Sequence, residues 1–229
     1  MPQGSAPATR PALSGRPAHG GELRRPGHDL RRRAERAARR VEAVLGTPVR
    51  PDVRVAASAA DAARAIGAAS VDGLAAVAHD GRVIVVPETY GRLTPTGRDV
   101  VLAHELTHVA AGTDGLPPWL YEGFADYVAY RDAGLAVPEA AAELAEEVRA
   151  GRLPENLPEP ADFAPGAPRL AQSYQEAWLA CRLIAHAYGE ATLVRLYRDA
   201  QRVGAGRALP VPVAELTRDW RAYLGEELA

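Results

Sequence analysis

The stretch His104-Glu105-Leu106-Thr107-His108 decides how the rest of this sequence is interpreted. On a helix with about 3.6 residues per turn, His104 and His108 project from the same face, one turn apart. Imidazole nitrogens bind zinc well, and catalytic zinc sites use three protein ligands and leave a fourth position for water. Glu105, beside the first histidine, can take a proton from that water. The spacing therefore predicts a catalytic zinc site carried by a helix.

The residues around this stretch support a helix. Thr94 followed by Pro95 predicts an N-cap with proline at the first helical position, and Thr96 with Asp99 offers an alternative capping box. Gly112 is expected to end the helix. Apolar residues on both sides of the histidines predict that the helix is buried: Val100, Val101, Leu102, Leu106 and Val109. A buried helix with two hydrogen-bonded histidines and no metal is the competing interpretation.

A second predicted helix, residues 119–128, follows a short loop at 112–115 and the pair Pro117-Pro118. Glu122 and Asp126 are four residues apart, so both carboxylates lie on one face. Because a short loop makes the two helices neighbours, we expect Glu122 to be the third zinc ligand. Asp126 is then expected to accept the free N–H of a ligating histidine. Solvated acids are the alternative, but the segment is rich in apolar residues: Trp119, Leu120, Phe124 and Val128.

Together, H-E-L-T-H and the following P-x-W-L-x-E-G-x-A-D-Y resemble the gluzincin group of zinc metallopeptidases, particularly the compact peptidase MA-like domains. The resemblance implies one zinc ion held by His104, His108 and Glu122. It also implies that Glu105 is the general base and that Asp126 orients a ligating histidine. The chain departs from the related aminopeptidases because it lacks their G-x-M-E-N motif, so an amine-anchoring site of that kind is not expected.

The specific resemblance covers residues 100–130, with a looser likeness that continues to the C-terminus. Gluzincins commonly place a tyrosine or histidine of the C-terminal lobe beside the zinc, where it stabilises the oxyanion. Tyr174 lies in the corresponding region, so the resemblance makes it a candidate catalytic residue. It is also one of eight tyrosines, and aromatic residues at helical spacing commonly fill a core. Both interpretations of Tyr174 remain open at this point.

Composition sets further bounds. The 229 residues, 47% of them hydrophobic, can bury one substantial core or two small lobes. The formal net charge of -2 argues against a general polyanion binder. Cys181 is the only cysteine, so an internal disulfide is impossible, and its apolar helical surroundings predict an inert buried thiol.

The N-terminal residues 1–27 are rich in proline, glycine, serine and arginine, and we expect them to form a disordered tail. Residues 28–229 are expected to form one zinc metallopeptidase domain. The sequence contains no apolar run long enough for a signal-peptide core or a membrane span. The cytoplasm is therefore the default expectation for its location, and the compartment stays open.

Residues 29–45 predict a helix with one apolar stripe and one basic face. Arginines make up that face: Arg31, Arg32, Arg33, Arg36, Arg39 and Arg40. One interpretation is a contact with nucleic acid or anionic lipid. The other is a charged face, partly paired with Glu35 and Glu42, that solvates the helix. We favour the second, so nucleic acid is not an expected partner.

The expected fold is α+β, mostly helical and zincin-like, with a small N-terminal α/β lobe, the motif helix at the centre and a helical C-terminal lobe. Residues 53–55, 74–78 and 82–86 predict the strands of a short sheet, with Asp80-Gly81 as a hairpin turn. The resemblance further suggests that the strand at 83–86, just before the motif helix, forms the cleft edge and pairs with extended substrate.

These observations predict a zinc peptidase that acts on a peptide or protein substrate, with Glu105 as the base. A metzincin-like peptidase is one alternative, because Asp114 follows His108 by the spacing of that group's third ligand. However, Ala111 replaces the glycine that this group has three residues after the second histidine. The only methionine is Met1, so a Met-turn is absent. A zinc-bearing binding module without turnover is the other alternative, although a structural site has no use for a base. Nothing in the sequence indicates an oligomeric state.

Overall fold

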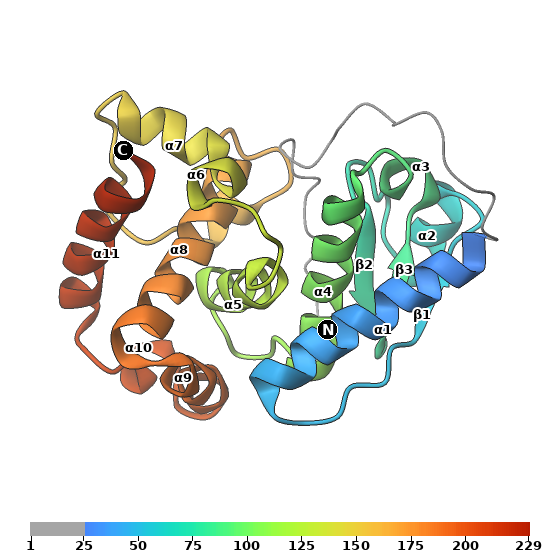
Figure 1. The fold of residues 1–229 in the computed structure, drawn as a ribbon, viewed down its shortest axis with the longest axis horizontal. Helices are drawn as coiled ribbons and strands as arrows, with labels where there is room; N and C mark the ends of the chain where they lie inside the picture. The colour runs from blue at the N-terminus through green and yellow to red at the C-terminus, as the bar shows by residue number, and fades with distance from the viewer. Residues whose placement is uncertain (1–25) are drawn as a thin grey trace. The chain divides into compact units, whose positions relative to one another are not determined.

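The computed structural model describes residues 26–229, which are mostly helical and include one three-stranded sheet (Figure 1). The chain divides into two compact units, the first ending at Gly112 and the second beginning at Thr113. The first unit is α/β and contains the sheet, whereas the second consists of helices and loops. The predicted α+β, mostly helical fold is confirmed. A single functional domain over residues 28–229 stays a prediction.

The sheet of the first unit has the strand order β1-β3-β2, formed by Val53–Val55, Arg82–Val85 and Ala76–His79. β2 and β3 form an antiparallel hairpin, and β1 adds to β3 in parallel. At the hairpin turn, Asp80 and Gly81 have φ angles of 48° and 73°. Two successive left-handed residues characterise the tight turn that suits twisted strands, and Asp-Gly adopts it readily. The predicted hairpin turn is confirmed.

The position of β3 corrects the expectation that residues 83–86 form a cleft edge. Val83 lies opposite Val53 of β1 on one side and opposite Ala78 of β2 on the other. A strand with a neighbour on each side has no free backbone edge for an extended peptide. The uninterrupted apolar run from Val83 to Val86 is typical of a strand covered on both faces. β2 is the edge strand that packs against the motif helix.

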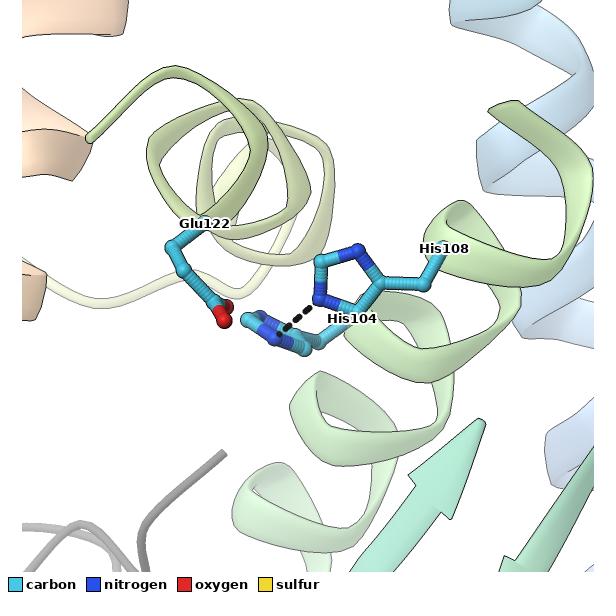
Figure 2. Close-up of side chains that lie close together, drawn as sticks. All are labelled: His104, His108 and Glu122. Atoms are coloured by element: carbon cyan, nitrogen blue, oxygen red, sulfur yellow. Dashed lines mark hydrogen bonds between the residues drawn. The ribbon is translucent and has the colours of Figure 1, made fainter. Parts of the chain in front are cut away.

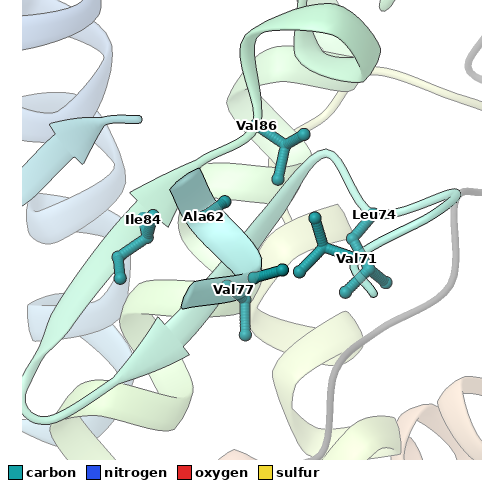
Figure 3. Close-up of a cluster of buried hydrophobic side chains, with 7 residues drawn as sticks. Ala62, Val71, Leu74, Val77, Ile84 and Val86 are labelled. Carbon is teal, nitrogen blue, oxygen red and sulfur yellow. The ribbon is translucent and has the colours of Figure 1, made fainter. Parts of the chain in front are cut away.

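Four helices accompany the sheet in the described part of the first unit. Their bounds are Pro26–Leu45 (α1), Ala59–Ile66 (α2), Pro87–Tyr90 (α3) and Pro95–Ala111 (α4). α2 begins at Ser58, whose side chain accepts a hydrogen bond from the N–H of Asp61 at 3.2 Å. A buried cluster joins α2 to the sheet (Figure 3): Ala62, Ala63, Val71, Leu74, Val77, Ile84 and Val86. Burial of each larger member contributes about 1.5–3 kcal/mol, so this cluster holds the sheet in place.

The motif helix is α4, and its ends follow from local capping. Thr94 accepts a hydrogen bond from the N–H of Gly97 at 3.0 Å, and Pro95 occupies the first helical position. This confirms the cap predicted at Thr94. The helix ends at Gly112, whose φ of 68° suits glycine. α4 then packs against α1 and against strands β2 and β3.

The second unit is a helical assembly around α8. Its helices are Pro118–Tyr130 (α5), Val137–Ala140 (α6), Ala142–Arg149 (α7), Leu170–Tyr188 (α8), Glu190–Val203 (α9), Ala205–Ala208 (α10) and Val213–Leu228 (α11), with a 3-10 turn at Pro160–Phe163 (η2). α8 packs against α5, α7, α9 and α11. Every residue from Ser173 to Cys181 is buried. A surface helix buries only one apolar stripe, whereas this part of α8 is buried on all sides. α8 is therefore the core helix of this unit.

The predicted disordered tail falls almost entirely outside the described residues, because these begin at Pro26. Pro26 and Gly27, which the prediction included in the tail, belong to α1. Between residues 26 and 229, no helix combines the length and the apolar composition needed to cross a bilayer.

Candidate metal centre

α4 brings His104 and His108 together on one face, as their spacing predicts. Their Nε2 atoms are 3.0 Å apart, and their rings meet edge to face at 84°. Two nitrogens that each lie about 2.0–2.1 Å from one tetrahedral zinc ion would be separated by roughly 3.3 Å. Both side chains are buried. The two imidazoles therefore converge at a spacing close to the one that a shared ion requires, and it also fits the competing interpretation of two hydrogen-bonded histidines.

Glu122, carried by α5, adds a carboxylate to this group (Figure 2). One ligand atom from each of His104, His108 and Glu122 lies within 4.8 Å of the other two, and all three residues are buried. Buried ionisable groups are costly unless they are paired or bind a metal. Two imidazole nitrogens with one carboxylate oxygen form a donor set typical of catalytic zinc sites. The group could therefore bind a metal ion, and it is the only group of this kind in residues 26–229.

Asp114, the third ligand in the metzincin alternative, does not belong to this group. It lies in the loop between α4 and α5 and is exposed. The buried carboxylate that completes the set of three comes from Glu122 instead. Among the described residues, the group that could hold a metal ion therefore contains Glu122 and does not contain Asp114.

Glu105, directly after the first histidine, is 1% exposed. Its Oε2 atom accepts a hydrogen bond from the backbone N–H of Ala78 at 2.7 Å. Ala78 lies on β2, the edge strand that packs against α4. A backbone donor from the sheet thus contacts the residue predicted to be the general base, a contact that the sequence did not predict.

Asp126 follows Glu122 by one turn of α5, and each is only 1% exposed. The alternative of solvated acids on a helix surface is therefore wrong.

Burial raises the pKa of the Cys181 thiol, and the negative charge of Asp126 raises it further. Cys181 is fully buried, as predicted. The contact of Asp126 with a ligating histidine stays a prediction.

Gly123, directly after Glu122, allows α5 to approach α8 closely. A Cβ atom at this position would lie 2.2 Å from the carbonyl oxygen of Ala177 and 3.0 Å from the sulfur of Cys181. No other residue fits here without displacing the α8 backbone. Glycine is a poor helix former, so close packing explains its presence in α5. The placement of Glu122 consequently depends on this contact between helices.

Tyr174, the candidate catalytic tyrosine, lies near the start of α8 and is 3% exposed. Its ring meets that of Phe163 in η2 edge to face, with centroids 5.3 Å apart. This ring contact agrees with a packing role, and a catalytic role stays a prediction.

Tyr197 of α9 is a neighbour of Glu122 that the sequence did not single out. Its ring packs on Phe124 with centroids 4.4 Å apart. Burial raises the pKa of the Tyr197 phenol, and the negative charge of Glu122 raises it further. The phenol is therefore protonated at neutral pH beside the Glu122 carboxylate. Only the helical stripe of α9, which indicates burial and no polar role, could have drawn attention to it.

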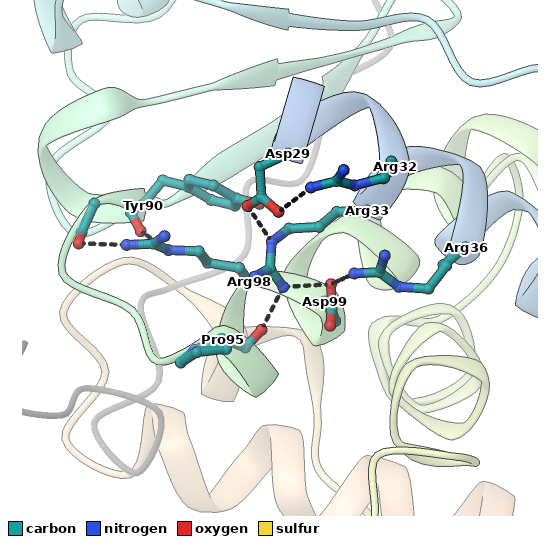
Figure 4. Close-up of polar contacts among 9 residues, drawn as sticks. Asp29, Arg32, Arg33, Arg36, Tyr90, Pro95, Arg98 and Asp99 are labelled. Atoms are coloured by element: carbon teal, nitrogen blue, oxygen red, sulfur yellow. Dashed lines mark hydrogen bonds and ion pairs between the residues drawn. The ribbon is translucent and has the colours of Figure 1, made fainter. Parts of the chain in front are cut away.

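Arg33 of α1 is bound to the start of the motif helix (Figure 4). Its guanidinium donates to the carboxylate of Asp29 at 2.8 Å, to the carbonyl of Pro95 at 3.0 Å and to the carboxylate of Asp99 at 2.8 Å. Arg36 donates to the same Asp99 oxygen at 3.2 Å. We call this set of contacts the arginine clamp. It acts on the first turns of α4, which precede the turns that carry His104 and His108.

Ion pairs occupy four arginines of the predicted basic face: Arg31, Arg32, Arg33 and Arg36. Their carboxylate partners belong to the first unit as well: Asp29, Glu35 and Asp99. Charges that are paired within the protein contribute less to the attraction of a polyanion. The pairing therefore favours a structural role for this face over contact with nucleic acid.

Comparison with known families links the first unit to one group. The family model described as the eCIS core domain matches residues 33–116. eCIS denotes the extracellular contractile injection system, and the family belongs to a zincin-like peptidase clan. The match spans the sheet and all of α4, and it ends before Glu122. Searches of curated proteins and of solved structures found no match. Residues 33–116 are thus similar to a family of a zincin-like clan, and no particular gluzincin is identified.

Proposed function

We propose that this protein is a zinc-dependent peptidase of gluzincin type. The observation that carries the proposal is the buried group of His104, His108 and Glu122, with ligand atoms within 4.8 Å of one another. The eCIS core match over residues 33–116 supports it, since that family belongs to a zincin-like clan. A carboxylate next to the first histidine distinguishes the site from a purely structural one, which needs no base.

Each residue of the proposed site has a defined task. Zinc bound here would lower the pKa of a coordinated water to about 7 and polarise a peptide carbonyl. The Glu105 carboxylate accepts the proton of the attacking water and passes it to the leaving amine. Asp126 accepts the N–H of a ligating histidine and keeps that ring in orientation. Tyr174 donates a hydrogen bond to the developing oxyanion.

Metal content and hydrolysis test this proposal together. We expect the purified protein to hold one zinc ion per chain and to cleave members of a peptide library, with cleavage abolished by a chelator. Glu122→Ala should lose the zinc, whereas Asp114→Ala, the matched acid in the preceding loop, should keep it. Glu105→Gln should keep zinc and fold but lose about 10²–10⁴-fold in turnover, because the amide cannot accept the proton.

Two results would contradict it. Loss of zinc in Asp114→Ala with retention in Glu122→Ala would favour the metzincin ligand set. Full zinc occupancy without cleavage of any library member would favour a binding module that carries zinc without turnover.

A further inference from the structure

One backbone N–H of β2 is directed away from the sheet toward α4. In an antiparallel pair, opposite residues alternate between exchanging two hydrogen bonds and exchanging none. Val83 of β3 directs its N–H toward β1, where it donates to the carbonyl of Asp52 at 2.9 Å. Ala78 lies opposite Val83 and so forms a pair of the second kind. The N–H and C=O of Ala78 consequently face the free edge of β2.

The Ala78 N–H is donated to Oε2 of Glu105 at 2.7 Å. This length is typical of a hydrogen bond to an ionised group, which is stronger than a bond between neutral groups. Glu105 is 1% exposed, so water competes little for the contact. A glutamate side chain is flexible by itself, and a short bond to a rigid strand restricts it to one orientation.

We infer that Ala78 is a positioning residue, whose backbone N–H fixes the orientation of the Glu105 carboxylate. The catalytic meaning of this contact rests on the proposed peptidase function, whereas the contact itself does not. The donor is available only because β2 lies at an edge, since a strand on that side would take the N–H into its own ladder. It also requires the observed register, because a shift by one residue would turn the N–H toward β3.

A backbone donor can be deleted with proline, which has no N–H. Proline is tolerated on edge strands where the N–H faces outward. Ala78→Pro should therefore delete the contact to Glu105 while leaving the ladder bonds between β2 and β3. Ala76→Pro is the matched control, because Ala76 has the same orientation two residues earlier on β2. The control imposes the same backbone restriction and keeps the Ala78 N–H.

Amide hydrogen exchange tests the contact without any activity. In the zinc-free full chain, Glu105→Ala should accelerate exchange of the Ala78 N–H by about 10-fold, because a net hydrogen-bond contribution of about 1–1.5 kcal/mol is lost. The N–H of Ile84, in the adjacent ladder pair of the hairpin, should be unaffected. Unchanged exchange at Ala78 would overturn the inference, and this measurement decides the matter even if the proline variant fails to fold.

Peptide hydrolysis tests the consequence for Glu105. Ala78→Pro should lower kcat by about 10-fold while KM and zinc content stay near those of the parent, and Ala76→Pro should change kcat little. In a Glu105→Ala background, Ala78→Pro should add no further loss, because its effect acts through that carboxylate. A parent-like kcat in Ala78→Pro would overturn the inference. A parent chain without hydrolysis but with Ala78 exchange controlled by Glu105 would instead refute the peptidase proposal and leave the positioning contact established.

Discussion

α4 carries His104 and His108, and α5 carries Glu122. Each of these two helices makes a contact of a different kind with its own unit. In the first unit, α4 packs its apolar residues on α1 and the sheet and receives two sets of polar bonds: the arginine clamp at its start and the Ala78 N–H on Glu105. In the second unit, α5 is fixed by steric fit, because Gly123 leaves no room for a Cβ beside Ala177. Polar contacts can be removed one at a time at modest cost. Two closely packed helix backbones leave no room for an added methyl group. The contacts of α4 and those of α5 should therefore respond differently to mutation.

Two carboxyl groups that contact arginine, Asp29 in the first unit and Glu176 in the second, have pKa shifts of opposite direction. Hydrogen bonding to Arg33 lowers the pKa of Asp29, a half-exposed carboxyl in α1. Its stabilising contribution is therefore present at neutral pH and is lost as acid protonates Asp29. In the second unit, burial raises the pKa of Glu176 to about 7, although Arg169 donates to it at 2.7 Å. With rising pH, the contribution of Asp29 to the unfolding free energy should therefore increase, and the contribution of Glu176 should decrease.

The largest effect is expected from Gly123→Ala, which attacks the steric contact of the second unit. The added methyl group would overlap the Ala177 carbonyl, and we expect a loss of about 3 kcal/mol or more in unfolding free energy. Gly225→Ala in α11 is the matched control, because a Cβ there meets nothing within 4 Å and alanine favours a helix by about 1 kcal/mol. Urea unfolding of both variants measures the difference. Equal midpoints for Gly123→Ala and the parent would show that the helices do not pack this closely.

The next effect concerns the pH dependence of the second unit. Between pH 4.5 and about 7, the folded protein keeps the Glu176 proton that the unfolded chain releases, so unfolding free energy should fall as pH rises. We expect a loss of about 1–3 kcal/mol across this range. Glu176→Gln, which cannot titrate, should remove this contribution to the pH dependence. Identical pH profiles of urea unfolding for the variant and the parent would rule out a proton on Glu176.

The smallest effect is expected from the arginine clamp of the first unit. Arg33→Ala removes three hydrogen bonds to α1 and α4 and should cost about 1–2 kcal/mol, because its partners remain reachable by water. Arg31→Ala is the control, since its exposed pair with Glu35 should contribute less than about 0.5 kcal/mol. The Arg33 effect should shrink when acid protonates Asp29. An equal cost for both variants in urea unfolding would show that the clamp is no more than surface charge.

The sequence by itself determined the features that depend on neighbours along the chain. The Thr94 cap, the Gly112 stop and the turn at Asp80-Gly81 all lie where the sequence predicts them. The same holds for the convergence of His104 and His108, which needs only helical spacing. These features follow from backbone preferences and hydrogen bonds within about four residues, so they hold in any fold that contains the helix or the turn.

Only the tertiary structure decided which distant groups meet. The local sequence pattern does not indicate the central place of β3 or the contact between Ala78 and Glu105 across 27 residues. Nor does it indicate the burial of Glu176 or the fit of Gly123 against Ala177. An apolar run of residues does not tell whether a strand lies at the edge or in the centre of a sheet. A glycine in a helical sequence indicates a weak helix former and does not tell which helix packs against it. These features depend on which surfaces pack against one another, and that choice is made by burial summed over the whole unit rather than by any single segment.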